Sequence, residues 1–595
     1  MTDSPRLPRS KFRASLRDRW NEAHDFDPAD PLVGLSRHDL SGPVIERRTV
    51  LRLLAASGVL TAAHLLPGVG VRPARAAAGG TLRAGWAAVG EFRTIDPAQI
   101  NQVLLFQISS NVLSGLTHIN PQLQAEGDLA VDWTVDDTGT QYTFNLREGV
   151  TFHNGDPFTA DDVIFTYERS SDPDQSIHSR VLANVAGIEK LGSHKVRFSL
   201  KAPQASFLVK TLERSSGRAM TIVSRGALAS MGASDYGLRA VGTGPFRVTD
   251  HKLGQSMTLE RFENYYDPER PKLDKIVITP IIDPEPLAAA IEAGDIHIIG
   301  GNPVAPELVD RFEANPDLNV STVPAPGFQG VFLNPWRDPM QVSDFSKPIE
   351  ELKREPGFMV RLAIAKAIDR DLYIRQAQFG RGTPAYGTIN PAMGFYFDDT
   401  LGETSEQAFD MEAARKLLAD AGFPNGDGFP TLKILCTPAA RRDCLVIKNL
   451  LKKSIGIDIE LDTKDFPVLL DEFQTMNFDL CRLGSGGDFD PDDGLVDWVQ
   501  TESKFNGRKR NKDEMPFGLF SDPEVDDLVA RQSATADVEA RRTLVQKANR
   551  ITSDKVAQAF LFHPADVQVT RKEVDFPVKS RIPGLVDMDR VTLSG

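Results

Sequence analysis

The sequence predicts an α/β protein built from more than one lobe, and three observations lead to this. The chain has 595 residues, whereas a single hydrophobic core rarely grows beyond about 250–300 residues. Stretches with a two-residue apolar period alternate with stretches of helical period along most of the chain. No repeat period connects these stretches. We therefore expect mixed sheets flanked by helices.

The strand and helix signals follow one another in a mixed order. Strands are expected at residues 80–86, 142–146, 196–200, 256–261, 275–282, 295–299, 432–435 and 457–461. Helices are expected at residues 159–168, 285–293, 361–370, 412–421, 445–454 and 523–553. Thr159, with Asp162 three residues later, resembles a capping box at a helix start. Gly294 and Gly422 follow helical stretches and are typical helix stops.

Composition excludes several classes of protein. Hydrophobic residues make up 41% and charged residues 25% of the chain, which is typical of soluble globular proteins. The formal net charge of −14 argues against binding to the phosphate backbone of nucleic acid. The three cysteines, Cys436, Cys444 and Cys481, are too few for a disulfide scaffold and lack zinc-site spacing. We expect them to be small buried residues or to form a single bridge.

Residues 1–78 have the features of a targeting segment. Arg47-Arg48 precedes a moderately apolar stretch, residues 53–71, and small residues of the A-x-A type follow at 76–78. This order is typical of a secretory signal cleaved near Ala76–Ala78, and the arginine pair resembles a twin-arginine signal. An uncleaved membrane anchor is the alternative, but glycines, a proline and a histidine dilute the apolar stretch. The long segment before the arginine pair leaves open whether residues 1–43 are translated.

Motifs of catalysis and metal binding are absent from the sequence. It contains no GxxxxGK[ST], HExxH, CxxC or GxSxG pattern. The histidines are scattered singly, and the aspartates at 488–493 lack the register of a calcium loop. We therefore expect no catalytic residues, no metal site and no cofactor.

Five blocks of sequence together carry a resemblance to a known family. They are QYTFNLREGVTFHNGDPFTADDVIFTYERSSDP (141–173), GTGPFRVTDHKLGQSMTLERFENYYDPERPKLDKIVI (242–278) with EAGDIHII (292–299), RLAIAKAIDRD (361–371) with GTPAYGTINP (382–391), MEAARKLLADAGFPNG (411–426) and GGDFDPDDGL (486–495). In this order they resemble family 5 of the extracytoplasmic solute-binding proteins, the oligopeptide, dipeptide and nickel-binding group that serves ABC importers. The resemblance covers nearly all of residues 80–595.

The resemblance implies an organisation in domains. The fold would be a two-lobed periplasmic binding protein fold of type II, in the large cluster with an extra subdomain and with a hinge between mixed sheets. Lobe I would comprise residues 79–300 with its subdomain, and lobe II residues 301–564. Residues 565–595 would return to lobe I. Glycine and proline near the two crossings suit a hinge.

The resemblance also implies ligand-binding residues. In peptide-binding members, an acidic residue in a Gly-rich loop receives the ammonium group of the ligand, and here it would be Asp488. Arg482 would steer a ligand carboxylate or hold Asp488, and Gly486 and Gly487 would let the ligand backbone approach closely. On lobe I the corresponding positions are Asn101, Val103 and His178. The sequence departs from peptide binders here, because position 101 is not acidic and no tyrosine stands at 178–179.

Three hypotheses about function follow. The first is a periplasmic binding protein that delivers a short peptide or peptide-like solute to the permease of an ABC importer. The second keeps the family but changes the ligand to a sugar, an opine-like conjugate or a metal chelate. The third is an exported enzyme on the same scaffold, for which the sequence holds no cofactor motif. The expected partners are the solute, the permease and the twin-arginine machinery, with the protein itself a monomer.

Overall fold

The protein is described by a computed structural model. The described residues are 79–87, 93–100, 103–120, 124–214, 220–301, 304–486, 490–503, 505–506, 518–576 and 585–594, and all lie within one compact unit. The predicted targeting segment, residues 1–78, lies outside them. Within the described stretches, no helix combines the length and the apolar character needed to cross a membrane.

A seven-stranded sheet has the strand order β12-β19-β11-β1-β10-β9-β8. Its strands are β1 (Thr81–Trp86), β8 (Phe246–Lys252), β9 (Ser256–Arg261), β10 (Lys275–Pro280), β11 (Ile298–Gly300), β12 (Leu318–Pro324) and β19 (Ala565–Arg571). β1 pairs in parallel with β10 and β11, so Trp86 lies in register with Pro280 and Gly300. The carboxyl ends of these parallel strands therefore share one edge, where open α/β sheets commonly hold ligands.

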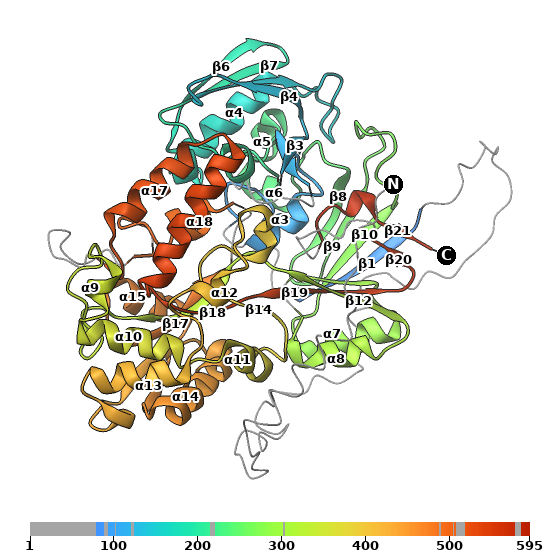
Figure 1. The fold of residues 1–595 in the computed structure, drawn as a ribbon. Helices are drawn as coiled ribbons and strands as arrows, with labels where there is room; N and C mark the ends of the chain where they lie inside the picture. Colours follow the sequence, from blue (N-terminus) through green and yellow to red (C-terminus); the bar gives the residue numbers. More distant parts are fainter. Residues whose placement is uncertain are drawn as a thin grey trace, which may run out of the picture. The chain divides into compact units, whose positions relative to one another are not determined.

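Helices cover both faces of this sheet (Figure 1). α7 (Pro284–Ala293) and α8 (Pro306–Glu313) pack on one face, in an apolar cluster with Val567 and Val569 of β19. α3 (Val103–Ser109), α5 (Arg225–Met231) and α6 (Ala233–Leu238) join a second cluster on the other face. α7 ends at Gly294 in the left-handed region with φ 78°, as its stop signal predicted.

A six-stranded sheet has the order β14-β18-β13-β17-β15-β16. Its strands are β13 (Phe328–Leu333), β14 (Thr383–Pro384), β15 (Leu432–Cys436), β16 (Ile459–Thr463), β17 (Leu480–Ser485) and β18 (Ala559–His563). The surrounding helices are α9 (Ile349–Leu352), α10 (Pro356–Lys366), α11 (Arg370–Ala377), α12 (Leu401–Thr404), α13 (Met411–Asp420), α14 (Arg441–Ile455), α15 (Phe466–Gln474), α16 (Asp492–Val496), α17 (Pro523–Ala534) and α18 (Val538–Asp554). One continuous apolar core joins most of these elements.

A four-stranded antiparallel sheet, β4-β5-β7-β6, forms a smaller subdomain with α4 (Ala160–Ser171). Its strands are β4 (Ala130–Val135), β5 (Gln141–Leu146), β6 (Val185–Gly192) and β7 (Lys195–Leu200). Two small two-stranded sheets pair β2 (Thr117–Ile119) with β3 (Ala125–Gly127) and β20 (Val574–Asp575) with β21 (Thr592–Leu593). Thr159 caps α4, and its backbone N–H donates to Asp162 Oδ2 at 2.9 Å. The predicted capping box is confirmed.

The chain passes between the two large sheets twice. β12 ends at Pro324 in the seven-stranded sheet, and β13 begins in the six-stranded sheet at Phe328. β18 ends at His563 in the six-stranded sheet, and β19 begins at Ala565 in the seven-stranded sheet. The N–H of Ala325 donates to the carbonyl of Pro564 at 3.0 Å, so the two crossing segments are joined to each other.

The first crossing differs from the sequence-based boundary near Gly300-Gly301. Residues 304–324 stay with the seven-stranded sheet, where β12 pairs with β19 over its whole length. The apolar side chains Val309 and Phe312 of α8 pack in the same cluster as β19. Burial of this helix face therefore keeps α8 and β12 with the first sheet, and the chain leaves it after Pro324.

The single helix expected at 523–553 is two helices, α17 and α18. Thr535 ends α17 in an extended conformation, and Asp537 begins α18 by accepting a hydrogen bond from the N–H of Ala540 at 2.8 Å. Cap residues at the junction thus end one helix and start the next. The prediction of one long helix is wrong because it overlooked these cap residues.

The three cysteines are buried and free. Burial raises the pKa of the Cys481 thiol well above its usual value, which keeps that sulfur protonated. The expectation of small buried residues is confirmed, and the alternative of a single bridge is not what the structure holds.

Candidate functional site

The predicted binding loop, residues 486–489, starts where β17 ends, beside the crossing segments. Ser485, the last residue of β17, pairs with Phe328, the first residue of β13 after the first crossing. Gly486 is exposed, and a Cβ added there would meet no atom within 4 Å. Gly487 and Asp488, both predicted site residues, lie outside the described residues. The described parts of this loop are therefore its two attachment points.

Hydrogen bonds fix both attachment points. Ser485 Oγ donates to Asp493 Oδ2 at 2.7 Å and so joins the residue before the loop to the helix after it. Gln329 Nε2 donates to the carbonyl of Ser485 at 3.2 Å. These hydrogen bonds tie Ser485, the last residue before the loop, to β13 and to α16.

Arg482 is part of this support. Its Nε and Nη2 donate to Asp443 Oδ2 at 3.1 and 2.6 Å, and its Nη1 donates to Gln329 Oε1 at 2.6 Å. The guanidinium also lies 5.7 Å from the centre of the Phe562 ring. The sequence suggested that Arg482 steers a ligand carboxylate or holds Asp488. Within the described residues Arg482 binds Asp443 and Gln329, which makes it a positioning residue for β17.

The aspartates after the loop are held by buried partners. Arg541 donates to both carboxylate oxygens of Asp490, at 2.8 and 2.6 Å. Burial opposes ionisation of Asp492, but Arg541, Lys210 and hydrogen bonds from Ser206 and Gln532 hold its pKa below the usual value. These carboxylates anchor the loop, and in the described stretches no three His, Cys, Asp or Glu side chains gather into a metal site.

A second set of contacts joins the subdomain side of the first lobe to the helices of the second. Ser206 Oγ donates to Asp492 Oδ2 at 2.6 Å, and the N–H of Ala205 donates to the carbonyl of Ser533 at 2.7 Å. Lys210, in the π-helical turn η3 (Phe207–Thr211), lies 3.7 Å from Asp497. We call these three contacts the polar clasp. The clasp engages Asp492, so it links contact between the lobes to the end of the binding loop.

Of the ligand-binding residues predicted on the first lobe, the structure describes the side chain of one, His178. Asn101 lies outside the described residues, and Val103 begins α3 with a side chain that the structure does not describe. His178 Nε2 donates to the carbonyl of Ile100 at 2.7 Å, and its ring packs edge-on against Phe106 of α3. His178 therefore supports the segment that leads into α3.

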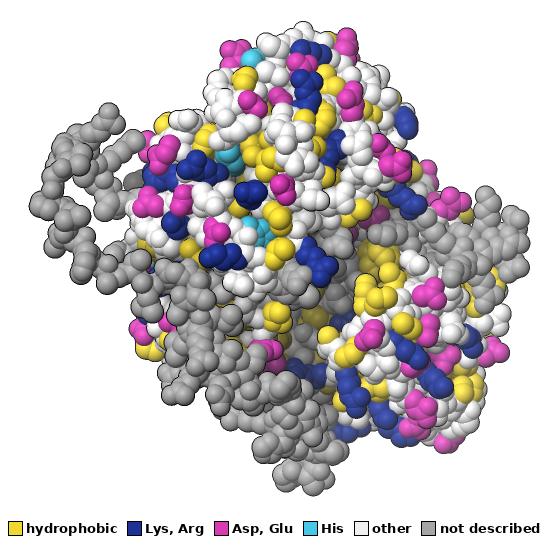
Figure 2. Space-filling model, turned by 180° about the vertical axis from the view of Figure 1, so that it is seen from behind, with side chains coloured by type: hydrophobic (Ala, Val, Ile, Leu, Met, Phe, Trp, Pro, Cys, Tyr) yellow, Lys and Arg dark blue, Asp and Glu magenta, His cyan; other side chains and the backbone are white. Residues whose placement is uncertain are grey.

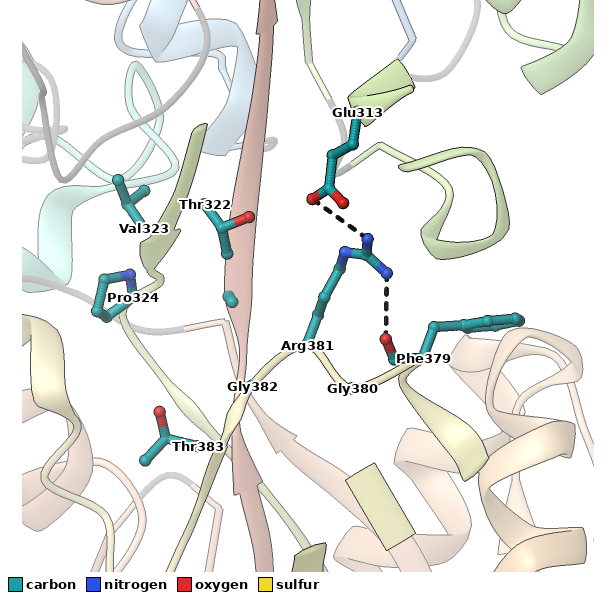
Figure 3. A pocket seen from close by; sticks show the side chains of 10 residues that line it. Glu313, Thr322, Val323, Pro324, Phe379, Gly380, Arg381, Gly382 and Thr383 are labelled. Atoms are coloured by element: carbon teal, nitrogen blue, oxygen red, sulfur yellow. Dashed lines mark hydrogen bonds and ion pairs between the residues drawn. The ribbon is translucent and has the colours of Figure 1, made fainter. Parts of the chain in front are cut away.

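A cavity of about 480 Å³ lies beside the crossings. Thr322, Pro324 and Ala565 line it from the seven-stranded sheet, and Thr383 lines it from β14. Figure 3 shows Arg381 in this cavity, directed toward Glu313 of α8. Arg381 also donates to Asp310 at 2.6 Å. These ion pairs join the loop before β14 to α8, across the crossing.

Sequence reasoning missed the partners that hold the loop. Asp443 lies 39 residues before Arg482, Arg541 lies 51 residues after Asp490, and Ser206 lies 286 residues before Asp492. No local period or motif connects residues so far apart in the chain.

Comparisons with known proteins extend this picture. A family model described as "Bacterial extracellular solute-binding proteins, family 5 Middle" matches residues 124–507. The glutathione-binding proteins GsiB of Escherichia coli (strain K12) and of Shigella flexneri serotype 5b (strain 8401) are each 29% identical over 341 residues. These alignments cover 57% of this chain but only 61% and 62% of the two relatives.

Solved structures share the fold. DppA from Helicobacter pylori in complex with the peptide STSA is 23% identical, with a TM-score of 0.67 over 87% of this chain and 98% of that chain. AppA from Bacillus subtilis in complex with a nonapeptide is 21% identical, with a TM-score of 0.66 over 87% and 99%. AgaA from A. tumefaciens R10, in complex with agropinic acid, is 23% identical with a TM-score of 0.66 over 87% and 99%. The predicted α/β, two-lobed binding-protein fold is confirmed.

Proposed function

We propose a function from one premise: the chain belongs to family 5 of the bacterial extracellular solute-binding proteins. The protein binds a short peptide or peptide-like solute between its two lobes and delivers it to the permease of an ABC importer. It acts by binding and release, without catalysing a reaction. The observation that carries this proposal is the loop after β17, anchored at both ends by buried polar groups beside the two crossings.

The two lobes follow from the sheets. The first lobe comprises residues 79–324 and 565–594, around the seven-stranded sheet and the subdomain. The second comprises residues 328–563, around the six-stranded sheet. The crossings at 325–327 and 564 form the hinge, and solute that contacts both lobes shifts the population toward the closed form.

Asp488 receives the ammonium group of the solute. A carboxylate that receives an ammonium group makes a charge-assisted hydrogen bond, which is stronger where water is excluded. The relatives named for glutathione, and the peptides named in complexes with the same fold, support a ligand that carries both an ammonium group and a peptide backbone.

The protein is exported and acts as a monomer. The arginine pair and the small-residue site at 76–78 support cleavage of a twin-arginine signal. On the face seen in Figure 2, acidic and basic side chains are interspersed, which suits a freely diffusing protein. Measuring the intact mass of the protein recovered from the periplasm tests cleavage. Cleavage removes the mass of the signal segment, whereas a retained signal leaves the mass of the full chain.

Isothermal titration with glutathione, Ala-Ala-Ala and N-acetyl-Ala-Ala-Ala tests the ligand class. We expect the free-amine peptides to bind and the acetylated peptide to bind at least ten-fold more weakly. Asp488→Asn removes a hydrogen bond to a charged group, worth about 1.5–3 kcal/mol. It should therefore weaken the binding of the free-amine peptides and leave the binding of the acetylated peptide unchanged. The exposed Asp137→Asn is the matched control. Equal affinity for acetylated and free peptide refutes the role of Asp488, and failure of all three probes refutes the peptide class.

A further inference from the structure

Two of the three buried cysteines lie together on one face of the six-stranded sheet. Cys436 is the last residue of β15, and Cys444 lies near the start of α14, a helix that packs against β15. The Cys444 thiol donates a hydrogen bond to the Cys436 sulfur. The two residues therefore form a pair of neighbouring thiols inside the second lobe.

The third cysteine points away from this pair. Cys481 of β17 is in register with Leu435 of β15, and residues paired in this way carry their side chains on the same face of the sheet. Since side chains alternate along a strand, Cys436 points to the opposite face. The sheet thus separates Cys481 from the pair, and Cys444 is the cysteine that can bond to Cys436.

The two thiols of the pair differ in acidity. The hydrogen bond from the Cys444 thiol is the main reason why the pKa of Cys436 is lowered to about 7. The Thr463 hydroxyl, 3.7 Å from the Cys436 sulfur, acts in the same direction. The charge of Arg441 does so too, whereas burial and the Asp462 carboxylate oppose it. The pKa of Cys444 is raised by the same hydrogen bond and by burial. Cys436 is therefore the thiol that reacts as a thiolate, and Cys444 keeps its proton.

One exposed turn of the chain lies next to the pair. The 3₁₀ turn η6 (Pro438–Ala440) joins β15 to α14, and its residues Pro438 and Ala439 are exposed. Both thiols are buried beneath the surface. A local opening of this turn is enough to admit a molecule as small as hydrogen peroxide, because short exposed turns open without unfolding of the core.

We propose that Cys436 and Cys444 are a redox-active dithiol, which peroxides oxidise to a disulfide within the folded protein. The Cys436 thiolate attacks one oxygen of hydrogen peroxide and the O–O bond breaks, which leaves a sulfenic acid on Cys436 and a hydroxide that takes up a proton to become water. The Cys444 sulfur then attacks the Cys436 sulfur, the S–O bond breaks, and the Cys444 proton leaves with that oxygen as a second water. Two thiols and one peroxide thus give one disulfide and two waters.

The disulfide joins β15 covalently to α14 beside a residue that supports β17. Asp443 directly precedes Cys444 and accepts hydrogen bonds from Arg482 of β17. Oxidation therefore ties this support to the sheet, and it spares Cys436 from the irreversible steps of sulfur oxidation. The inference goes beyond the proposed function, since it does not depend on which solute the protein carries.

Peptide mapping of the oxidised protein tests the pairing without any variant. The folded full chain is treated with an equimolar amount of hydrogen peroxide, remaining thiols are blocked with N-ethylmaleimide in urea, and disulfide-linked peptides are identified by mass spectrometry. We expect a disulfide between Cys436 and Cys444 and a blocked thiol at Cys481. Dithiothreitol should reverse the disulfide, and the oxidation rate should rise with pH to half its maximum near pH 7, the pKa of Cys436.

Serine variants identify the attacking thiol. Cys481→Ser is the matched control, and it should keep both the disulfide and its rate of formation. In Cys444→Ser the Cys436 sulfenic acid should accumulate and react with dimedone, because the second thiol is missing. In Cys436→Ser no disulfide forms, and dimedone labelling should fall by about ten-fold or more, since the thiol of lowest pKa is removed.

Three results overturn the proposal. Cys481 enters the disulfide, or Cys436 and Cys444 stay reduced when the folded protein is treated with peroxide, or their disulfide forms only in urea. In the last case their closeness in the sequence, and not the fold, brings them together. Peptide binding measured on the same samples separates the two proposals, because a protein that binds no peptide can still form the disulfide.

Discussion

Replacing Arg541 by methionine removes the buried cation that anchors the binding loop. The Arg541 and Asp490 side chains are each 6% exposed and joined by two hydrogen bonds. Arg541→Met leaves Asp490 without its cation, and Asp492, at 3.5 Å from the same guanidinium, loses part of its compensation. Removing one partner of a buried ion pair costs about 3–5 kcal/mol, and we expect a loss of this size in the free energy of unfolding.

Urea unfolding followed by far-ultraviolet circular dichroism measures this loss. The control is Arg531→Met, because Arg531 and Asp527 form a pair that is 60% and 62% exposed, worth at most about 1 kcal/mol. The double variant Arg541→Met with Asp490→Asn should recover part of the loss, because it removes the uncompensated charge. If Arg541→Met costs no more than Arg531→Met, the anchoring role of this pair is wrong.

Three further predictions address the loop, the clasp and the hinge. Gly484→Ala should lower the melting temperature because its Cβ would collide with the β13 backbone, whereas the Cβ of Gly486→Ala meets open space and should leave the melting temperature unchanged. Equal melting temperatures of the two variants would contradict this packing. A lower ligand affinity of Gly486→Ala would indicate that the solute approaches this glycine closely. Ser206→Ala removes one hydrogen bond of the clasp, and we expect peptide dissociation measured by stopped flow to be about ten-fold faster, since this corresponds to roughly 1.4 kcal/mol; the exposed Ser230→Ala should not change this rate. Burial lowers the pKa of His563 to about 4, whereas an exposed histidine in the unfolded chain has a pKa of about 6.5. As pH falls below about 6.5, the imidazole is therefore protonated in the unfolded chain before it is protonated in the folded protein, and the free energy of unfolding decreases toward pH 4. His563→Asn should reduce the decrease in the free energy of unfolding from pH 7 to pH 5, measured by urea unfolding, by about 2 kcal/mol; an unchanged decrease would contradict a buried neutral histidine.

Local chemistry was predictable from sequence where it acts over a few residues. The capping box at Thr159 and the stop at Gly294 depend on neighbours within one helical turn, and both stand as expected. The break between α17 and α18 was also written locally, in the cap at Asp537. It was missed because a long amphipathic period suggested one helix.

Non-local pairing was not predictable from one sequence. β12 (LNVSTVP) is an edge strand with a mostly polar exposed face, so nothing in its own residues says which sheet it joins. It pairs with β19, more than two hundred residues later in the chain, so the first crossing follows Pro324 and not Gly300-Gly301 as the sequence predicted. Asp443 could not be recognised as the partner of Arg482 for the same reason. The two residues lie 39 positions apart, and an ion pair between them produces no periodic pattern in the sequence.

Native mass spectrometry of the mature protein, purified from the periplasm without denaturation, shows directly which solute the protein carries. We expect adducts with peptide masses that disappear on denaturation and are depleted in Asp488→Asn. Recovery of a single non-peptide mass that is retained in Asp488→Asn would contradict the claim that this protein carries peptide-like solutes.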